Sequence, residues 1–279
     1  MKRMLMIVVA LGLVLGSFSS AVAQRKREIT VISREESSGT RGAFDELMNI
    51  TDGKTNQLFR EAVIVSSTDE AASKVEVDRW AIGYTSLGSV TNKIKALQID
   101  GVVPNEANVK NGSYKIARPF VFGVKTGSTN QLANDFLKFV VSKQGQAVVA
   151  RGGYITVDAA GDYTPAKLTG KITLSGSTSV ERVVQRLKEE YEKLNPGASL
   201  EINYNGSSAG IRDCLTDKSH IAMSSRALKD DEKAQLAGTT FALDGIAVIV
   251  NRQNTLNGMK AETVTKIFKG ETRHWEDAK

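Results

Sequence analysis

Three clusters of small hydroxyl residues and glycines stand out in this sequence, and each follows an apolar run and precedes an amphipathic segment. Such apolar runs are typical of buried strands and the amphipathic segments of helices, so each cluster should lie at a strand-to-helix turn. A weaker fourth case, Ser224-Ser225-Arg226, follows Ile221–Met223. The three main clusters are Arg34-Glu-Glu-Ser-Ser-Gly-Thr40, Gly176-Ser-Thr-Ser179 and Asn205-Gly-Ser-Ser-Ala-Gly210.

The chemistry that such turns favour is the binding of an anion. A helix N-terminus leaves its first backbone N–H groups unpaired, and the helix dipole adds about half a positive charge there. Glycine allows close approach to the backbone, and Ser and Thr hydroxyls add donors. Arg34 supplies a fork of donors that suits a tetrahedral oxyanion. A single Ser or Thr before a helix is more often a simple N-cap, so the prediction depends on three clusters occurring together.

The elements that position these clusters alternate along the chain. Helical spacing is clearest in Val180–Leu194, with Asn195-Pro196-Gly197 as its stop, and recurs in 44–48 and 132–140. Alternating strands and helices predict an α/β fold with mainly parallel sheets, and the polar stretch 158–170 should be a surface connection. The predicted strands are Ile29–Ser33, Ala81–Leu87, Ile116–Val124, Ile172–Ser175, Leu200–Tyr204, Ile221–Met223 and Ile246–Asn251.

Residues 1–23 have the features of a cleavable export signal: a positive start, an apolar run over 5–15 and Ala21-Val-Ala23 as the cleavage site. Removing Lys2 and Arg3 lowers the formal net charge from +6 to +4, a mild basic bias that suits anions but not nucleic acid. No later apolar stretch reaches about 18 residues, so we expect the mature protein to be soluble. The only cysteine, Cys214, cannot form an internal disulfide and should be a small buried helix residue.

An enzymatic function is the main alternative class. Ser38 could be imagined as a nucleophile, but the sequence has only His220 and His274 as histidines, and neither stands in a recognisable base motif. No metal-ligand cluster appears in the sequence. We therefore expect neither catalysis nor a cofactor nor a metal.

The chain resembles the phosphate-binding subunit of the high-affinity phosphate ABC importer, a type II periplasmic binding protein. The resemblance implies two α/β lobes, each a mainly parallel sheet flanked by helices, that close on the ligand like a Venus flytrap. Its motifs span nearly all of residues 24–279. They are Arg34-Glu-Glu-Ser-Ser-Gly-Thr-Arg41, Ile82-Gly-Tyr-Thr-Ser-Leu-Gly88, Ala117-Arg-Pro-Phe120, Ser175-Gly-Ser-Thr-Ser-Val180, Asn205-Gly-Ser-Ser-Ala-Gly-Ile211, Met223-Ser-Ser-Arg-Ala-Leu228, Asp244-Gly-Ile-Ala-Val-Ile-Val-Asn251 and Ile267-Phe-Lys-Gly270 with Trp275.

Each matching motif implies particular ligand contacts. Ser225 stands where some family members place an Asp that accepts the proton of phosphate, and this leaves the proton acceptor open. Glu36, which could instead pair with Arg34, and Asp244 are the nearby candidates. The implied phosphate-binding residues are Arg34, Ser38, Gly39, Thr40, Thr178, Ser179, Ser207 and Ser225.

The order of the motifs departs from the family. Family members usually begin with the Ser175–Val180 motif, whereas this chain opens at Arg34 and ends near Trp275. We expect a circular permutation in which residues 158–170 join the old ends. The chain should cross between lobes near 112–116 and 241–246. One lobe would then be 24–112 plus 242–279, and the other 113–241.

The resemblance implies a periplasmic, monomeric receptor that captures inorganic phosphate and delivers it to the transmembrane subunits of an ABC permease, with no role for nucleic acid. Two alternatives stay open within anion binding. The ligand could be sulfate, molybdate or another oxyanion, because Ser225 replaces the expected carboxylate. The chain could also be a sensory or structural module without a transporter.

Overall fold

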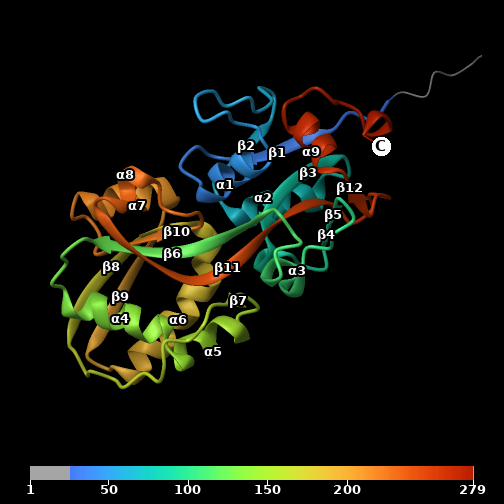
Figure 1. Ribbon diagram of the computed structural model, residues 1–279. Helices are drawn as coiled ribbons and strands as arrows, with labels where there is room; N and C mark the ends of the chain where they lie inside the picture. The colour runs from blue at the N-terminus through green and yellow to red at the C-terminus, as the bar shows by residue number, and fades with distance from the viewer. Residues whose placement is uncertain (1–25, 279) are drawn as a thin grey trace, which may run out of the picture.

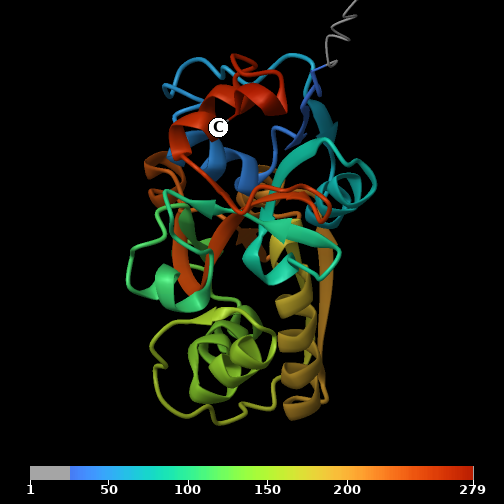
Figure 2. The same cartoon turned by 90° about the vertical axis from the view of Figure 1, so that its right-hand side faces the viewer.

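The computed structural model describes residues 26–278 (Figures 1 and 2). The expected export signal lies outside the described residues. Among residues 26–278, no helix is both long enough and apolar enough to span a membrane. The helices are α1 (Gly39–Leu47), α2 (Thr68–Val77), α3 (Glu106–Lys110), α4 (Gln131–Val141), α5 (Lys143–Arg151), α6 (Glu181–Leu194), α7 (Ser207–Leu215), α8 (Asp230–Lys233) and α9 (Ala261–Phe268).

Two long strands, β6 and β11, run through the middle of the molecule (Figure 1). The main sheet has the order β2-β1-β3-β11-β6-β10-β8-β9, and β4 and β7 also pair with β11. The strands are β1 (Thr30–Arg34), β2 (Val63–Val65), β3 (Ala81–Ser86), β4 (Ile94–Ala96), β5 (Gln98–Ile99), β6 (Ala117–Lys125), β7 (Ile155–Thr156), β8 (Gly170–Gly176), β9 (Ala198–Tyr204), β10 (Ile221–Ser224), β11 (Leu236–Asn251) and β12 (Gly258–Met259).

The expectation of mainly parallel sheets holds only for the outer strands. The pairs β1–β2, β1–β3, β8–β9 and β8–β10 are parallel. Every pair that β6 and β11 make is antiparallel, because β11 runs back beside β6 with a register shift between Thr240 and Ala242. The sheet is therefore mixed, with an antiparallel centre and parallel flanks.

Two large hydrophobic cores lie on either side of this centre. The continuous core draws its residues from 120 to 242 and includes Phe122 and Tyr191. The split core draws on 29–116 and 246–278, together with Ile155 of β7, and includes Phe44 and Phe268. The chain passes from one core to the other within β6 and again within β11. The two neighbouring strands β6 and β11 therefore carry the chain between the cores. Each core is completed by helices that pack on the part of the sheet next to it.

The first half of β11 was not predicted from the sequence. Only Ile246–Asn251 has the continuous apolar character of a buried strand, and the preceding 236–245 contains glycines and threonines. Pairing with β6 over residues 236–245 makes this half extended, and its partner supplies the order that its composition does not. The other predicted strands and the helix over 180–194 agree with β1, β3, β6, β8, β9, β10 and α6 to within a few residues.

The two ends of the described chain lie side by side. The Ile29 amide donates to the Arg273 carbonyl at 2.8 Å, and the Trp275 amide donates to the Arg27 carbonyl at 3.0 Å. Residues 158–169 form neither helix nor strand. The Ala160 amide bonds to the Val141 carbonyl and so holds this stretch beside α4. Cys214 is buried in α7, as expected.

Candidate functional site

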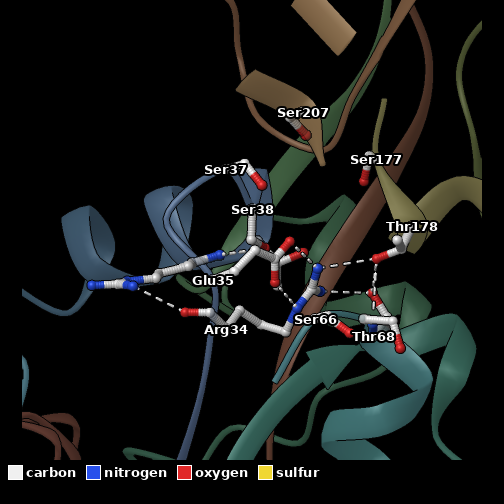
Figure 3. A network of polar contacts seen from close by, with 12 residues as sticks. Arg34, Glu35, Ser37, Ser38, Ser66, Thr68, Ser177, Thr178 and Ser207 are labelled. Atoms are coloured by element: carbon white, nitrogen blue, oxygen red, sulfur yellow. Dashed lines mark hydrogen bonds and ion pairs between the residues drawn. The ribbon is translucent and has the colours of Figure 1, made fainter. Parts of the chain in front are cut away.

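The three predicted clusters and the weaker fourth one meet in space through hydrogen bonds of their side chains. Figure 3 shows residues of the three main clusters around Arg34. Arg34 ends β1, and Ser38, Gly39 and Thr40 begin α1, all on the side of the split core. Thr178 and Ser179 form a 3-10 turn before α6, Ser207 begins α7 and Ser225 follows β10, all on the side of the continuous core. All eight predicted residues are buried except Thr178, which is half-buried.

Arg34 is the cation of the site, and only 2% of it is exposed. Its Nε and Nη2 donate to the two carboxylate oxygens of Glu35, each at 2.8 Å. Its Nη1 donates to Thr68 Oγ1 at 3.0 Å, and Nη2 also donates to Thr178 Oγ1 at 3.1 Å. Figure 3 shows the guanidinium with Glu35 on one side and the two threonines on the other. Arg34 therefore has one edge neutralised by a carboxylate and one edge turned toward hydroxyls.

Local contacts fix the start of α1 beside Arg34. Ser38 is the N-cap, and its Oγ accepts from the Arg41 amide at 3.2 Å. Arg41 in turn donates through Nη1 to the Arg34 carbonyl at 3.0 Å. A Cβ at Gly39 would lie 2.2 Å from Ser207 Oγ, so only glycine fits where α1 approaches α7. The backbone of the first turn of α1 therefore faces Ser207 of α7 directly, with no side chain of its own in between.

Glycines also shape the turns on the side of the continuous core. Gly176 has a φ of 147°, and a Cβ there would lie 2.1 Å from the Met223 carbonyl oxygen. Gly206, with a φ of 94°, precedes α7. These positive φ values favour glycine and let β8 and β9 turn sharply into the helices that follow. Ser207 Oγ accepts from the Ser225 amide at 3.1 Å, which joins the turn after β10 to the start of α7.

Hydroxyls from the two sides contact one another directly. Thr40 Oγ1 lies 2.6 Å from Ser179 Oγ, and Ser225 Oγ lies 3.5 Å from Thr40 Oγ1. The Ser208 amide donates to the Ser37 carbonyl at 3.0 Å, and the exposed Arg182–Asp69 ion pair at 3.1 Å also joins the two sides. The two halves therefore stand in a closed arrangement.

Thr68 is a residue of this hydrogen-bond network that the sequence analysis missed. It begins α2 on the side of the split core, is 2% exposed, and contacts Arg34, Thr178 and Ser179. A signal was present, because Ser66-Ser67-Thr68 follows an apolar segment and Ser67 with Glu70 fits the S-x-x-E start of a helix. The segment 63–65 was too short to be recognised as a strand.

The carboxylates are arranged differently from the expectation. Glu35, rather than Glu36, pairs with Arg34, and Glu36 is exposed, because the turn after β1 directs it outward. Asp244 is buried in an ion pair with Arg118 at 2.9 Å and also accepts from Ser86 Oγ at 2.8 Å and the Leu87 amide at 3.1 Å. Burial raises the pKa of Asp244, and Arg118 opposes this rise.

Comparisons with known proteins match this chain along most of its length. A family model described as a PBP superfamily domain matches residues 20–144 and 161–279. "Phosphate-binding protein PstS 2" of Streptococcus agalactiae is 38% identical over 276 residues, which cover 97% of this chain and 94% of that protein. A crystal structure of a phosphate-binding protein of a phosphate ABC transporter from Streptococcus pneumoniae is 40% identical, with a TM-score of 0.74, and the match covers 90% of this chain and all of that one.

A further relative matches only in part. "Phosphate-binding protein PstS" of Bacillus subtilis is 32% identical over 135 residues, which cover 48% of this chain and 43% of that protein. The chain is therefore similar over nearly its whole length to one set of relatives and over about half of its length to another.

Proposed function

The chain belongs to the PBP superfamily and, within it, to the family of the phosphate-binding proteins, and on that premise we propose that it captures inorganic phosphate for an ABC importer. The observation that carries the proposal is the position of Arg34. Its guanidinium is buried, is held on one edge by Glu35, and on the other edge faces hydroxyls that come from both cores.

Phosphate would take over hydrogen bonds that these hydroxyls now make with one another. Arg34, the backbone at Gly39 and the hydroxyls of Thr40, Thr178 and Ser179 can all donate to oxyanion oxygens. A hydrogen bond to a charged group contributes about 1.5–3 kcal/mol, and a micromolar complex needs about 8 kcal/mol. Several such bonds therefore suffice, even after the cost of removing water from the anion. No metal is needed for affinity.

Closure follows from the division of the site between two lobes. We place one lobe at residues 24–112 plus 242–279 and the other at 113–241. The two hydrophobic cores support a division into two lobes, but Tyr114 and Ile116 pack in the split core, which puts the first passage a few residues later, within β6. Arg34, Ser38 and Thr40 belong to the first lobe, and Thr178, Ser179, Ser207 and Ser225 belong to the second. A ligand that contacts both sets binds the closed state more tightly and shifts the equilibrium toward it.

We also propose that the chain is circularly permuted relative to part of its family. Rotated sequences can be aligned in the same order over only one of their two segments, which fits the partial match to the Bacillus subtilis relative. The streptococcal relatives would then share the order of this chain. The hydrogen bonds between 27–29 and 273–275 support closely spaced new ends, and residues 158–170 would join the old ones.

We further propose that the protein is exported to the periplasm through residues 1–23, acts as a monomer and delivers phosphate to the transmembrane subunits of an ABC permease. We also propose that it has no catalytic activity.

Isothermal titration of purified protein with phosphate, and separately with sulfate, tests the proposal. We expect saturable heat at micromolar protein with phosphate and a weaker response with sulfate. A lack of heat with phosphate would reject it, and binding of sulfate alone would reassign the ligand.

A further inference from the structure

We propose that Thr68 is a further ligand-binding residue, which contributes its hydroxyl to the anion and holds Arg34 in place. This inference rests on the proposed function and extends the site to α2, a third element beside β1 and α1. Thr68 is 2% exposed, so its hydroxyl has no access to bulk water and its hydrogen bonds are made within the protein.

The contacts of Thr68 Oγ1 are all to residues of the site. It accepts from Arg34 Nη1 at 3.0 Å and lies 3.1 Å from Thr178 Oγ1 and 2.9 Å from Ser179 Oγ. A threonine hydroxyl has one donor and two acceptor positions, so these three contacts use its full capacity. Thr68 therefore connects the buried cation of one core with two hydroxyls of the other.

The same contacts place Thr68 beside the anion. An anion that accepts from Thr178 and Ser179 has to lie next to an atom that now touches both of them. When the hydroxyls of Thr178 and Ser179 turn toward the anion, the hydrogen of Thr68 Oγ1 becomes free to follow, while Oγ1 keeps accepting from Arg34. The Thr68 amide points the same way, because it donates to Thr178 Oγ1 at 3.3 Å.

The neighbouring acidic residues do not oppose this role. Asp69 is turned to the exposed ion pair with Arg182, at 3.1 Å. Glu70 accepts from the amide and the hydroxyl of Ser66, both at 2.8 Å, and these hydrogen bonds lower the pKa of Glu70. Both carboxylates are thus engaged at the surface, and the group that α2 presents to the site is the neutral hydroxyl of Thr68.

Isothermal titration with phosphate of the Thr68→Val and Thr68→Ser variants tests the proposal. Valine keeps the shape and removes the hydroxyl, and loss of a bond to a charged ligand should weaken affinity by about tenfold or more. Serine keeps the hydroxyl and should remain within about threefold of the wild type. The matched control is Thr265→Val, because the Thr265 hydroxyl donates to the Met48 and Ala261 carbonyls, away from the site. Its affinity should be unchanged.

A purely structural role gives a different result. Thr68→Val would then lower the melting temperature without phosphate but leave the dissociation constant within about twofold of the wild type, and this outcome would overturn the proposal. If Thr68→Val does not fold, Thr68→Ala takes its place with the same expected loss. Failure of the underlying function is distinguishable, since the wild type itself would then give no heat with phosphate.

Discussion

Thr40 Oγ1 lies 2.6 Å from Ser179 Oγ, although the two residues are 139 positions apart in the chain and come from the sides of the molecule that hold different hydrophobic cores. Both stand in the first turn after a strand, one at the start of α1 and one just before α6. Their contact means that two strand-to-helix turns, from opposite sides of β6 and β11, point at the same place. The proposed phosphate binding and lobe closure both depend on the contact between these two turns.

Removing the cation should weaken phosphate binding strongly. Arg34→Ala takes a charged donor from a buried anion and leaves Glu35 without its partner, so we expect a loss of about tenfold or more in affinity. Arg212→Ala, which removes an exposed arginine of α7, is the control and should bind as the wild type does. Titration calorimetry measures both, and an unchanged dissociation constant for Arg34→Ala would remove Arg34 from the site.

Gly39→Ala should interfere with closure more than with folding. The added methyl would lie 2.2 Å from Ser207 Oγ and 2.9 Å from Ser225 Oγ, so the two sides would have to separate. Gly42→Ala is the matched control in the same helix, since its nearest atom would be Arg226 Cδ at 3.7 Å. We expect Gly39→Ala to lose phosphate affinity at nearly unchanged melting temperature. In small-angle scattering with phosphate, the Gly39→Ala variant should have a larger radius of gyration than Gly42→Ala. Equal radii of gyration would contradict the prediction.

The Arg118–Asp244 pair should stabilise the centre of the sheet. It joins β6 to β11, and both side chains are 2% exposed. Asp244→Ala leaves a buried arginine without its partner and should cost about 3–5 kcal/mol of unfolding free energy. Asp162→Ala, which breaks an exposed pair with Lys143, should cost about 1 kcal/mol or less. Urea unfolding measures the free energy of unfolding of both variants. Equal decreases would show that the central pair stabilises the fold no more than the exposed pair does.

Glu232 should make stability depend on pH. Burial alone would raise the pKa of Glu232, but two hydrogen bonds from Arg226 at 2.7 Å and one from the Lys229 amide outweigh it and lower that pKa. A lowered folded-state pKa gives stability that is present above the unfolded value of about 4.3 and is lost as pH falls through the folded value. Glu232→Gln should therefore be less stable than the wild type at pH 7, and the difference should shrink in acid.

The control for this pH dependence is Glu106→Gln, which changes an exposed carboxylate paired with Lys110. Its stability difference from the wild type should be small at every pH. A Glu232→Gln difference that stays constant from pH 7 down to about pH 3 would contradict the prediction.

Much of the site could be predicted because its residues occur in local patterns. A strand, a small polar cluster and a helix predict an anion site at the segments that hold Arg34, Thr40, Ser179 and Ser207, and the family resemblance implies these particular residues. Thr68 escaped prediction because β2 before it has only three residues, which is too short for an apolar run to be distinctive. Its place in the site depends on contacts with residues 110 and 111 positions away, which no local pattern contains.

The carboxylates and the central strand were less predictable for a related reason. Whether Glu35 or Glu36 reaches Arg34 depends on the direction of the backbone in one turn. The sequence has a glutamate at both positions and does not fix this direction. The first half of β11 gains its extended form from pairing with β6, which overrides its glycines and threonines. The antiparallel centre of the sheet likewise follows from how two distant segments pair.

A crystal structure of the protein grown with phosphate tests the central claim most directly. The account predicts one phosphate whose oxygens lie within hydrogen-bonding distance of Arg34 and Thr40 from one side and of Thr178 and Ser179 from the other. A phosphate that contacts residues of only one core, or that lies away from Arg34, would contradict it.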